Sequence, residues 1–279
     1  MENTTLTPGL YIVATPIGNL GDITLRAAEV LRGCDHVLAE DKRVSAKLLR
    51  HLGASKPMTA YNDHSDAADR ARIVERLGRE AVALVSDAGT PLISDPGYKL
   101  VRAAREAGIA VHTLPGPSAA IAALTLAGLP TDRFLFAGFL PPKAKARAEA
   151  IAEVGAVRAT LVFYESGPRL GDTLEALRDA LGARDAAVVR EISKLHEETV
   201  TGPLVELAAR YAKAGPKGEI VVVVGPPADA AEASDEELDS ALRTALASES
   251  ASRAAATVAA ALAVPRKRAY ARALELAGR

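Results

Sequence analysis

The segment SDAGTPLISDPG, residues 86–97, decides the fold of this chain. It follows the apolar run Ala81–Ser86 and precedes a helical pattern at Tyr98–Ala107. Two glycines, two prolines, two aspartates and three hydroxyl residues occupy its twelve positions. A strand, a polar loop and a helix in this order are typical of an α/β unit whose loop lies at the carboxyl end of the sheet. Ligands favour that end, so the sequence predicts a binding loop here.

The same alternation of apolar runs and helical patterns surrounds this loop, from Gly9 to Pro115. The further strands expected in this part are Leu10–Ala14, His36–Ala39 and Ala110–Leu114. The further helices expected are Thr24–Leu31 and Asp66–Leu77. The pattern predicts an open α/β sheet.

A second α/β cycle follows the segment GLPTDRF. Its expected strands are Phe134–Ala137, Thr160–Tyr164, Ala186–Glu191, Glu197–Thr201 and Glu219–Val224. Its expected helices are Lys143–Glu153, Leu170–Ala180 and Leu204–Lys213. The turn PGPSA enters an apolar helix, Ala119–Ala127, which we expect to bridge the two α/β domains.

After Gly225 the composition shifts to proline, alanine and acidic residues, and three short helical patterns follow. They span Asp235–Ala247, Ser252–Ala263 and Pro265–Leu276. Ser234 and Glu237 form a capping-box pattern before the first. The predicted domains are therefore 1–117 and 118–226, both α/β, and a small helical tail, 227–279.

Composition excludes several classes of protein. The 279 residues include 34 Lys and Arg against 35 Asp and Glu, so any contact with a nucleic acid must be local. The single cysteine, Cys34, has no partner for a disulfide, and no metal-ligand motif occurs, so no metal is expected. The polar start Met1–Pro8 is unlike a signal peptide, and no apolar stretch is long enough for a membrane span. A cytoplasmic protein is expected.

Two further loops resemble residues 86–97 in their position after a strand and before a helix. They are ATPIGNLGDIT at 14–24 and LPGPSAA at 114–120. Each of the three loops, taken alone, is as well explained by an ordinary turn. Ser118 and Asp95 are suitable helix caps, and Pro96 suits a first helical position. Three such loops in one domain gather along one edge of a parallel sheet, which favours a ligand site. They match neither a P-loop nor a dinucleotide fingerprint.

Polar clusters end several other strands. They are EDKR at 40–43, FYESGPRL at 163–170 and REISKLHEE at 190–198. EDKR is either a solvated helix start or a phosphate contact made by Lys42 and Arg43, with Glu40 or Asp41 as an orienting acid. Each of the other two clusters is either a solvated turn or part of a site. A basic helix start at Lys143, Lys145 and Arg147, near Phe136 and Phe139, is either an ordinary charged face or an RNA contact.

These motifs, together with AEDKR, GFLP and GEIVVVV, resemble the ribosomal small subunit methyltransferase I family of the tetrapyrrole-methylase superfamily. Their order and spacing extend from Leu10 to Val224. The resemblance implies a two-domain fold with an S-adenosyl-L-methionine cleft between the domains, and a homodimer. The implied reaction is 2'-O-methylation of cytidine 1402 (reference numbering) of 16S rRNA in the 30S subunit.

The resemblance also implies the site residues. Those implied for the cofactor are Pro16, Ile17, Gly18, Gly89, Thr90, Pro91, Ile93, Ser94, Asp95, Ser118, Ala119, Tyr164, Arg190, Gly218, Glu219 and Ile220. Those expected at the reacting atoms are Glu40, Asp41, Arg43, Glu165, Glu191 and Lys194, and five of them, all but Arg43, are candidates for the base that accepts the hydroxyl proton. The expected RNA-facing residues are Arg43, Lys143, Arg169 and Lys194.

Two departures and two alternatives stay open. The family usually has EDTR where this chain has Lys42, and its HEHNE-like stretch is YNDHSD, residues 61–66, here. The alternatives are a sister methylase acting on a tetrapyrrole or a protein side chain, and a non-catalytic ribosome-assembly factor. The basic residues of the last tail segment, from Arg266 to Arg272, either contact phosphate or keep the tail soluble.

Overall fold

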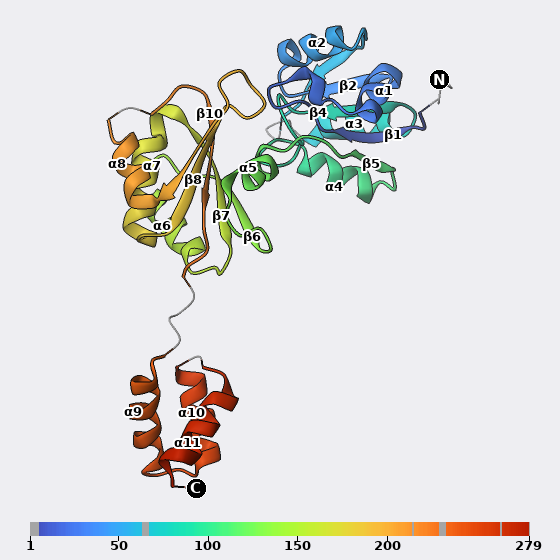
Figure 1. The fold of residues 1–279 in the computed structure, drawn as a ribbon. Helices are drawn as coiled ribbons and strands as arrows, with labels where there is room; N and C mark the ends of the chain where they lie inside the picture. Colours follow the sequence, from blue (N-terminus) through green and yellow to red (C-terminus); the bar gives the residue numbers. More distant parts are fainter. Residues whose placement is uncertain (1–5, 63–66, 214, 229–232, 263, 279) are drawn as a thin grey trace. The chain divides into compact units, whose positions relative to one another are not determined.

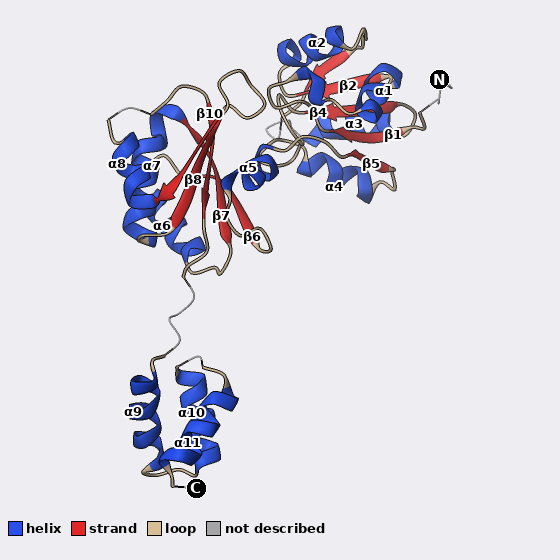
Figure 2. Ribbon diagram, viewed as in Figure 1, coloured by secondary structure: helices blue, strands red, loops and turns tan. Residues whose placement is uncertain are grey.

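A computed structural model describes residues 6–62, 67–213, 215–228, 233–262 and 264–278. The chain forms two compact units, Met1–Pro226 and Pro227–Arg279 (Figure 1). The first contains two five-stranded sheets and the second contains helices (Figure 2). Within the described part of the chain, no helix combines the length and apolar character needed to cross a bilayer.

The first sheet is parallel throughout, in the order β3-β2-β4-β1-β5. Its strands are β1 (Gly9–Val13), β2 (His36–Ala39), β3 (Met58–Ala60), β4 (Ala81–Val85) and β5 (Val111–Leu114). Successive side chains of a strand point to opposite faces, and here both faces are covered. Tyr11 and Val13 pack on the side of α1 (Leu25–Gly33) and α2 (Lys42–His51), whereas Leu10 packs on the side of α3 (Ala67–Leu77) and α4 (Tyr98–Glu106).

The strand order places a switch point between β1 and β4. From β1 the chain crosses to β2, on one side of the pair, and from β4 it crosses to β5, on the other. The loops after these neighbouring strands therefore diverge and leave a crevice at their carboxyl ends, which is where open α/β sheets bind ligands. Residues 86–97 form one of the two loops.

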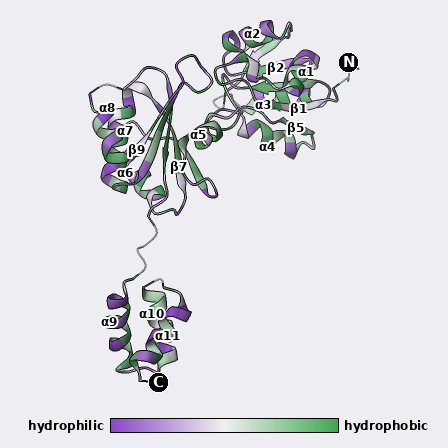
Figure 3. Ribbon diagram, viewed as in Figure 1, coloured by the Kyte–Doolittle hydropathy of each residue, from purple (hydrophilic) through white to green (hydrophobic). Residues whose placement is uncertain are grey.

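The second sheet has the order β6-β7-β10-β8-β9, with β6 parallel to β7 and the other pairs antiparallel. Its strands are β6 (Phe134–Phe139), β7 (Thr160–Ser166), β8 (Asp185–Arg190), β9 (Glu198–Pro203) and β10 (Glu219–Val224). One face packs against α6 (Ala144–Gly155), α7 (Leu170–Leu181) and α8 (Leu204–Tyr211). The other face packs against α5 (Ala119–Ala127), an apolar helix coloured mostly green in Figure 3.

The tail unit consists of α9 (Asp235–Leu246), α10 (Ala251–Ala261) and α11 (Arg266–Leu276) around a small core. The predicted capping box at Ser234 and Glu237 is present. Arg268 and Arg272, at the base of the predicted basic face, are paired with Asp235 and Asp239 of α9. Half of that predicted face is therefore neutralised within the unit.

The predicted strands and helices lie within two residues of those observed. The predicted helix ends at Asp66 and Ala263, and most of the divergent stretch 61–66, lie outside the described residues. The sequence did not predict β3 or α2, because β3 is only three residues long and α2 was considered only as a possible helix start at EDKR. The two α/β sheets lie within one compact unit, so a division at residue 117 stays a prediction.

Candidate functional site

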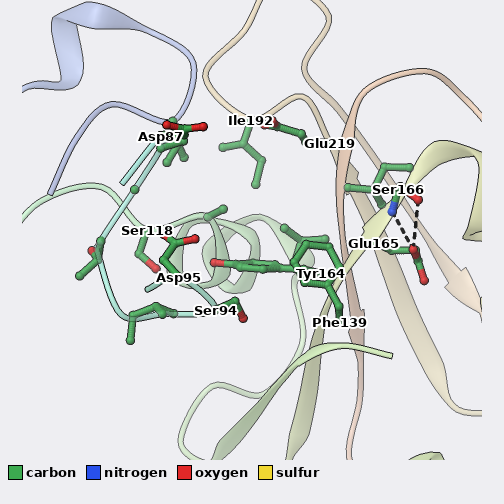
Figure 4. Close-up of a pocket in the computed structure, with 18 of the residues that line it drawn as sticks. Asp87, Ser94, Asp95, Ser118, Phe139, Tyr164, Glu165, Ser166, Ile192 and Glu219 are labelled. Atoms are coloured by element: carbon green, nitrogen blue, oxygen red, sulfur yellow. Dashed lines mark hydrogen bonds between the residues drawn. The ribbon is translucent and has the colours of Figure 1, made fainter. Parts of the chain in front are cut away.

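A cavity of about 400 Å³ opens in the 1–226 unit, and both sheets contribute to its walls (Figure 4). The first sheet contributes loops after β1, β2, β4 and β5, and the second contributes β6, β7, β10 and the loop after β8. The lining residues are Ile17, Glu40, Asp87, Ala88, Gly89, Thr90, Ile93, Ser94, Asp95, Ser118, Ala119, Phe139, Tyr164, Glu165, Ser166, Ile192, Gly218, Glu219, Ile220 and Val221.

Backbone contacts join the three glycine-containing loops at the crevice. The backbones of Thr15 and Gly89 exchange hydrogen bonds of 2.8 and 3.0 Å, which tie the loop after β1 to residues 86–97. The Thr90 hydroxyl donates to the carbonyl of Pro117 at 3.0 Å, which adds the loop before α5. Gly89 has a φ of +79°, a backbone conformation that glycine adopts without steric cost.

The loop 86–97 carries positive φ angles at two non-glycine residues, Leu92 at 76° and Ser94 at 64°. Such angles cost free energy and are found where a site requires a particular backbone path. The interpretation of Asp95 and Pro96 as a helix start was wrong. The helix α4 begins at Tyr98 after Gly97, whose φ is 136° and which has no side-chain cap. The tight loop continues past Pro96, and this leaves Asp95 at the cavity.

Three carboxylates line the cavity from the first sheet: Glu40, Asp87 and Asp95 (Figure 4 labels the two aspartates). Asp87 Oδ1 accepts a hydrogen bond from the Asp41 backbone at 2.9 Å, and Glu40 Oε2 accepts one from the Asp87 backbone at 3.3 Å. Burial raises the pKa of Asp95 to about 6, aided by the negative charges of Glu40 and Asp87 and opposed by a hydrogen bond with Ser86. No cation among the described residues contributes to the pKa of Asp95.

The second sheet contributes an aromatic wall. Tyr164 lies between Phe136 and Phe139, with ring centroids 4.8 and 5.5 Å away in edge-to-face geometry. Its ring extends across the cavity with the hydroxyl toward Ser118 and Asp95 (Figure 4). Burial raises the pKa of Tyr164, although hydrogen bonds with the Ala120 backbone and Ser118 oppose this. Ser118 occupies the N-cap position of α5 but makes no side-chain cap, so its hydroxyl is turned to Tyr164.

The loop after β8 closes one side of the cavity. Lys194 Nζ donates to Glu191 Oε1 at 2.8 Å and to Glu219 Oε2 at 2.9 Å. Burial alone would lower the pKa of Lys194, but these two hydrogen bonds outweigh it and raise that pKa; the hydrogen bond from Lys194 lowers the pKa of Glu191. Ser193 donates to Asp22 Oδ2 at 2.6 Å, which connects this loop to the loop after β1.

Two glycines in the predicted set are required by close approaches in this region. A Cβ on Gly18 would collide with the Lys194 side chain and lie 2.9 Å from the Ile192 carbonyl oxygen. A Cβ on Gly218, where φ is 109°, would lie 2.6 Å from the Glu191 carboxyl group. Gly18 does not line the cavity, and its absence of a side chain instead lets the loop after β8 approach.

Of the residues implied for the cofactor, twelve line the cavity: Ile17, Gly89, Thr90, Ile93, Ser94, Asp95, Ser118, Ala119, Tyr164, Gly218, Glu219 and Ile220. The other four, Pro16, Gly18, Pro91 and Arg190, do not. Arg190 donates to Glu198 at 3.1 Å and to the Lys217 carbonyl at 3.2 Å, so it supports the segment before Gly218.

The residues expected at the reacting atoms are not brought to one point. Glu40 lines the cavity, whereas Asp41 caps α2 and pairs with Arg43, whose hydrogen bond lowers the pKa of Asp41 to about 2. Glu191 and Lys194 pair with each other outside the lining.

Glu165 lies at the cavity wall, but its side chain is fully buried on the far side of β7. Its carboxylate accepts from the Ser166 backbone at 2.7 Å and from the Thr173 hydroxyl at 2.6 Å, and Arg169 lies 3.4 Å away. Arg169, expected to face RNA, donates to the Leu140 carbonyl instead of extending outward. Lys143 is exposed at the start of α6.

Six lining residues were not expected from the sequence: Asp87, Ala88, Phe139, Ser166, Ile192 and Val221. Asp87 and Ala88 belong to the very loop that was singled out, and Phe139 belongs to the GFLP motif, so both signals were available. Ile192 and Val221 also belong to quoted motifs, but an apolar residue looks the same in sequence whether it lines a core or a cavity. Among described residues, no cluster of three or more His, Cys, Asp or Glu is arranged to hold a metal.

The fold and the cavity define a class of methyl-transfer proteins. The family model described as Tetrapyrrole (Corrin/Porphyrin) Methylases matches residues 9–208. The crystal structure of diphthine synthase superposes with a TM-score of 0.62 at 18% identity, covering 77% of this chain and 89% of that one. This likeness confirms the predicted two-sheet fold.

Comparison with individual relatives narrows the class. A second family model, the RsmI C-terminal HTH domain, matches residues 232–277, the tail unit. The protein named ribosomal RNA small subunit methyltransferase I of Erythrobacter litoralis is 58% identical over 97% of this chain and 96% of its own length. The protein of that name from Mesorhizobium japonicum is 53% identical over 83% and 79%. The chain belongs to the ribosomal RNA small subunit methyltransferase I family, within the tetrapyrrole methylases.

Proposed function

We propose that this protein transfers a methyl group from S-adenosyl-L-methionine to the ribose 2'-hydroxyl of cytidine 1402 of 16S rRNA. The observation that carries the proposal is 58% identity to a relative named as a small subunit rRNA methyltransferase, over 97% of the chain and including the tail. The acceptor is proposed to lie within the 30S subunit, in the cytoplasm, and the protein to act as a homodimer.

The chemistry of the cavity fits the proposed cofactor. S-adenosylmethionine carries a cationic sulfonium and an ammonium group, and it supplies an activated methyl group when bound. The described lining includes five acidic residues and no lysine or arginine. Three of those acids, Glu40, Asp87 and Asp95, come from the loops of the first sheet. A bound cation would stabilise the Asp95 carboxylate, whose pKa is otherwise raised.

The remaining lining offers surfaces for the neutral parts of the cofactor. The cavity volume of about 400 Å³ lies in the range of small-molecule sites. Ile17, Ile192 and Val221 present apolar side chains suited to a purine ring, and Tyr164 adds an aromatic one. The loop 86–97 would hold the polar groups through its backbone and through Asp87 and Asp95.

The protein's own contribution to the reaction is positioning and proton acceptance. Holding two reactants in the correct geometry supplies on the order of 7 to 11 kcal/mol of the barrier. Of the five proposed bases, Glu40 alone lines the cavity without a saturating set of side-chain partners. Asp41, Glu191 and Lys194 are held in ion pairs, and Glu165 is buried. We propose Glu40 as the group that accepts the hydroxyl proton.

Charge supports an assembled particle as the substrate. The formal net charge is −1, so tight binding to free RNA at physiological salt is not expected from the global field. A preformed RNA surface would instead supply the shape that aligns one ribose with the cavity.

The test is methyl transfer to mapped positions. The protein is incubated with labelled S-adenosylmethionine and either free 16S rRNA or 30S particles lacking the modification, and the modified ribose is mapped. Label at the 2'-oxygen of cytidine 1402, more in particles than in free RNA, is expected. Cofactor binding is measured separately by calorimetry. Binding without transfer to either RNA would reject the substrate, and absence of binding would point to a non-catalytic assembly factor.

A further inference from the structure

We propose that the ring of Phe139 forms a nucleobase subsite at the mouth of the cavity, on which the base of the acceptor nucleotide stacks. This inference rests on the proposed function and names how that site receives its substrate. It concerns a residue outside the sets expected to bind the cofactor or to take part in catalysis.

A bulge in β6 sets the direction of the Phe139 side chain. Phe136 and Phe139 are three residues apart, so in a regular strand their side chains would point to opposite faces of the sheet. The register of β6 against β7 shifts between Phe136 and Gly138, and Gly138 has a φ of 64°. This bulge turns Phe139 to the face of Phe136, and both rings contact the one ring of Tyr164. Bulges next to active sites commonly re-aim a side chain in this way.

The side chain of Phe139 is exposed at the cavity. Phe139 lines the cavity and yet retains 57% of its accessible surface. Tyr98, Phe134 and Tyr270 are the other exposed aromatic side chains in the described residues, and none of them lines the cavity. A half-exposed aromatic ring at the wall of a cavity is able to stack an unpaired base.

Neighbouring residues hold the ring of Phe139 in place. The ring of Phe139 packs against Tyr164 in edge-to-face geometry, and the Tyr164 ring is itself held by contacts with Phe136 and α5. Leu140, the next residue, is buried, and its carbonyl accepts from Arg169. A Cβ on Gly138 would lie 3.1 Å from Ser94 Oγ, so the bulge fits closely against the loop 86–97. The ring is thus fixed relative to the cofactor loop before substrate arrives.

The charges around the cavity indicate the chemical class of the ligand. The acidic lining of the cavity disfavours phosphate at its wall, whereas a base is neutral and presents an aromatic face. Lys143 is exposed four residues after Phe139, where the flanking phosphates of a splayed-out nucleotide would be compensated. The ribose of the nucleotide stacked on Phe139 would then be the one nearest the cavity.

The test compares substitutions of two phenylalanines of the same strand, β6. Phe139→Leu keeps an apolar side chain but removes the aromatic face, whereas Phe139→Trp keeps an aromatic face and enlarges it. The control, Phe134→Leu, removes another phenylalanine ring, which is 45% exposed but lies outside the cavity. RNA affinity is measured with 30S particles, cofactor affinity by calorimetry, and stacking by a fluorescent base analogue at the acceptor position. Phe139→Leu is expected to raise KM for the RNA about tenfold, within the range of one lost base stack.

The outcomes are distinguishable. With Phe139→Leu, the cofactor Kd should be unchanged and the quenching of the base analogue should be lost, and Phe139→Trp should restore both RNA affinity and quenching. Weakened cofactor binding at unchanged RNA affinity would assign the ring to the purine of the cofactor, and an altered oligomeric state would assign it to a second copy of the chain; either overturns the proposal. An equal effect of Phe134→Leu also overturns it. Failure of the unsubstituted protein to methylate any RNA would reject the proposed function itself.

Discussion

The first sheet has five parallel strands, whereas three of the four strand pairings in the second sheet are antiparallel. A parallel sheet brings all its strand ends, and hence its loops, to one edge, so the first sheet supplies backbone turns and carboxylates. The second sheet supplies a face: on β7, Phe163 points into the core under α6 to α8, and Tyr164 points to the cavity. One cavity thus has an acidic wall of loops and an aromatic wall of sheet.

The largest expected effect is a loss of stability when the buried face of β7 is altered. Phe163 is fully buried, so Phe163→Ala should lower the free energy of unfolding by about 3–5 kcal/mol through lost burial and a cavity. Urea denaturation followed by circular dichroism measures this. Phe134→Ala, on an exposed ring of the neighbouring strand, is the control and should change stability much less. Equal losses in both would mean that the second sheet does not hold its core as described.

The next effect concerns the acidic wall. If Glu40 accepts the hydroxyl proton, Glu40→Gln should lower kcat by about a hundredfold or more, with little change in cofactor Kd. Rapid-quench methyl transfer and calorimetry measure the two quantities. Glu29→Gln, on the exposed face of α1, is a matched control. Full activity of Glu40→Gln would exclude Glu40 as the base.

A smaller effect depends on pH. The pKa of Asp95 is raised to about 6, so its carboxylate is lost as the pH falls below that value, and affinity for the cationic cofactor should fall with it. Asp95→Asn should weaken binding about tenfold at pH 8 and abolish this dependence. Because folding raises this carboxyl pKa from 3.8, the cofactor-free protein should lose stability as the pH rises from about 4 through about 6.

Calorimetric titrations between pH 5 and 8 and denaturation at each pH check both parts. Asp132→Asn, an exposed carboxyl outside the cavity, should retain the pH profile of the unsubstituted protein. A pH profile that survives in Asp95→Asn would show that Asp95 does not cause it.

The smallest effect tests the link between the two walls. Ser193 donates to Asp22 at 2.6 Å, but both groups are exposed. Ser193→Ala and Asp22→Ala should each accelerate cofactor release by only about threefold, as expected from one exposed hydrogen bond. The double substitution should add little to either single one, which stopped-flow measurement of release would establish. Fully additive effects would show that the two residues act separately.

Much of the fold was predictable from local pattern. The segment 86–97 was correctly expected between β4 and a helix. The alternation on either side located the other three strands expected in this domain, because strands buried on both faces form short apolar runs and helices bury residues every 3.6 positions. The helix was correctly expected from Tyr98, but Asp95–Pro96, which has the composition of a cap, does not begin it. Composition alone does not reveal that Leu92 and Ser94 take left-handed angles that carry the loop past that point.

The candidate site was predictable only as a set of loops. The sequence identified the segments, but it did not separate Glu40, which lines the cavity, from Asp41, which caps a helix beside it. Glu165 and Tyr164 are neighbours in one motif, yet the pleat of β7 sends one into a buried hydrogen-bond network and the other into the cavity. Which of two adjacent side chains faces a ligand depends on strand phase and on the partner sheet, and neither is written in the motif.

The sequence by itself determined the order of strands and helices, the glycine and proline positions that permit tight turns, and the family to which the chain belongs, because these depend on near neighbours along the chain. The tertiary structure decided that burial raises the pKa of Asp95, that Lys194 is already paired, and that a bulge turns Phe139 to the mouth of the cavity. These outcomes depend on contacts between residues far apart in sequence, where burial and charge are set by the packing of one sheet against the loops of the other.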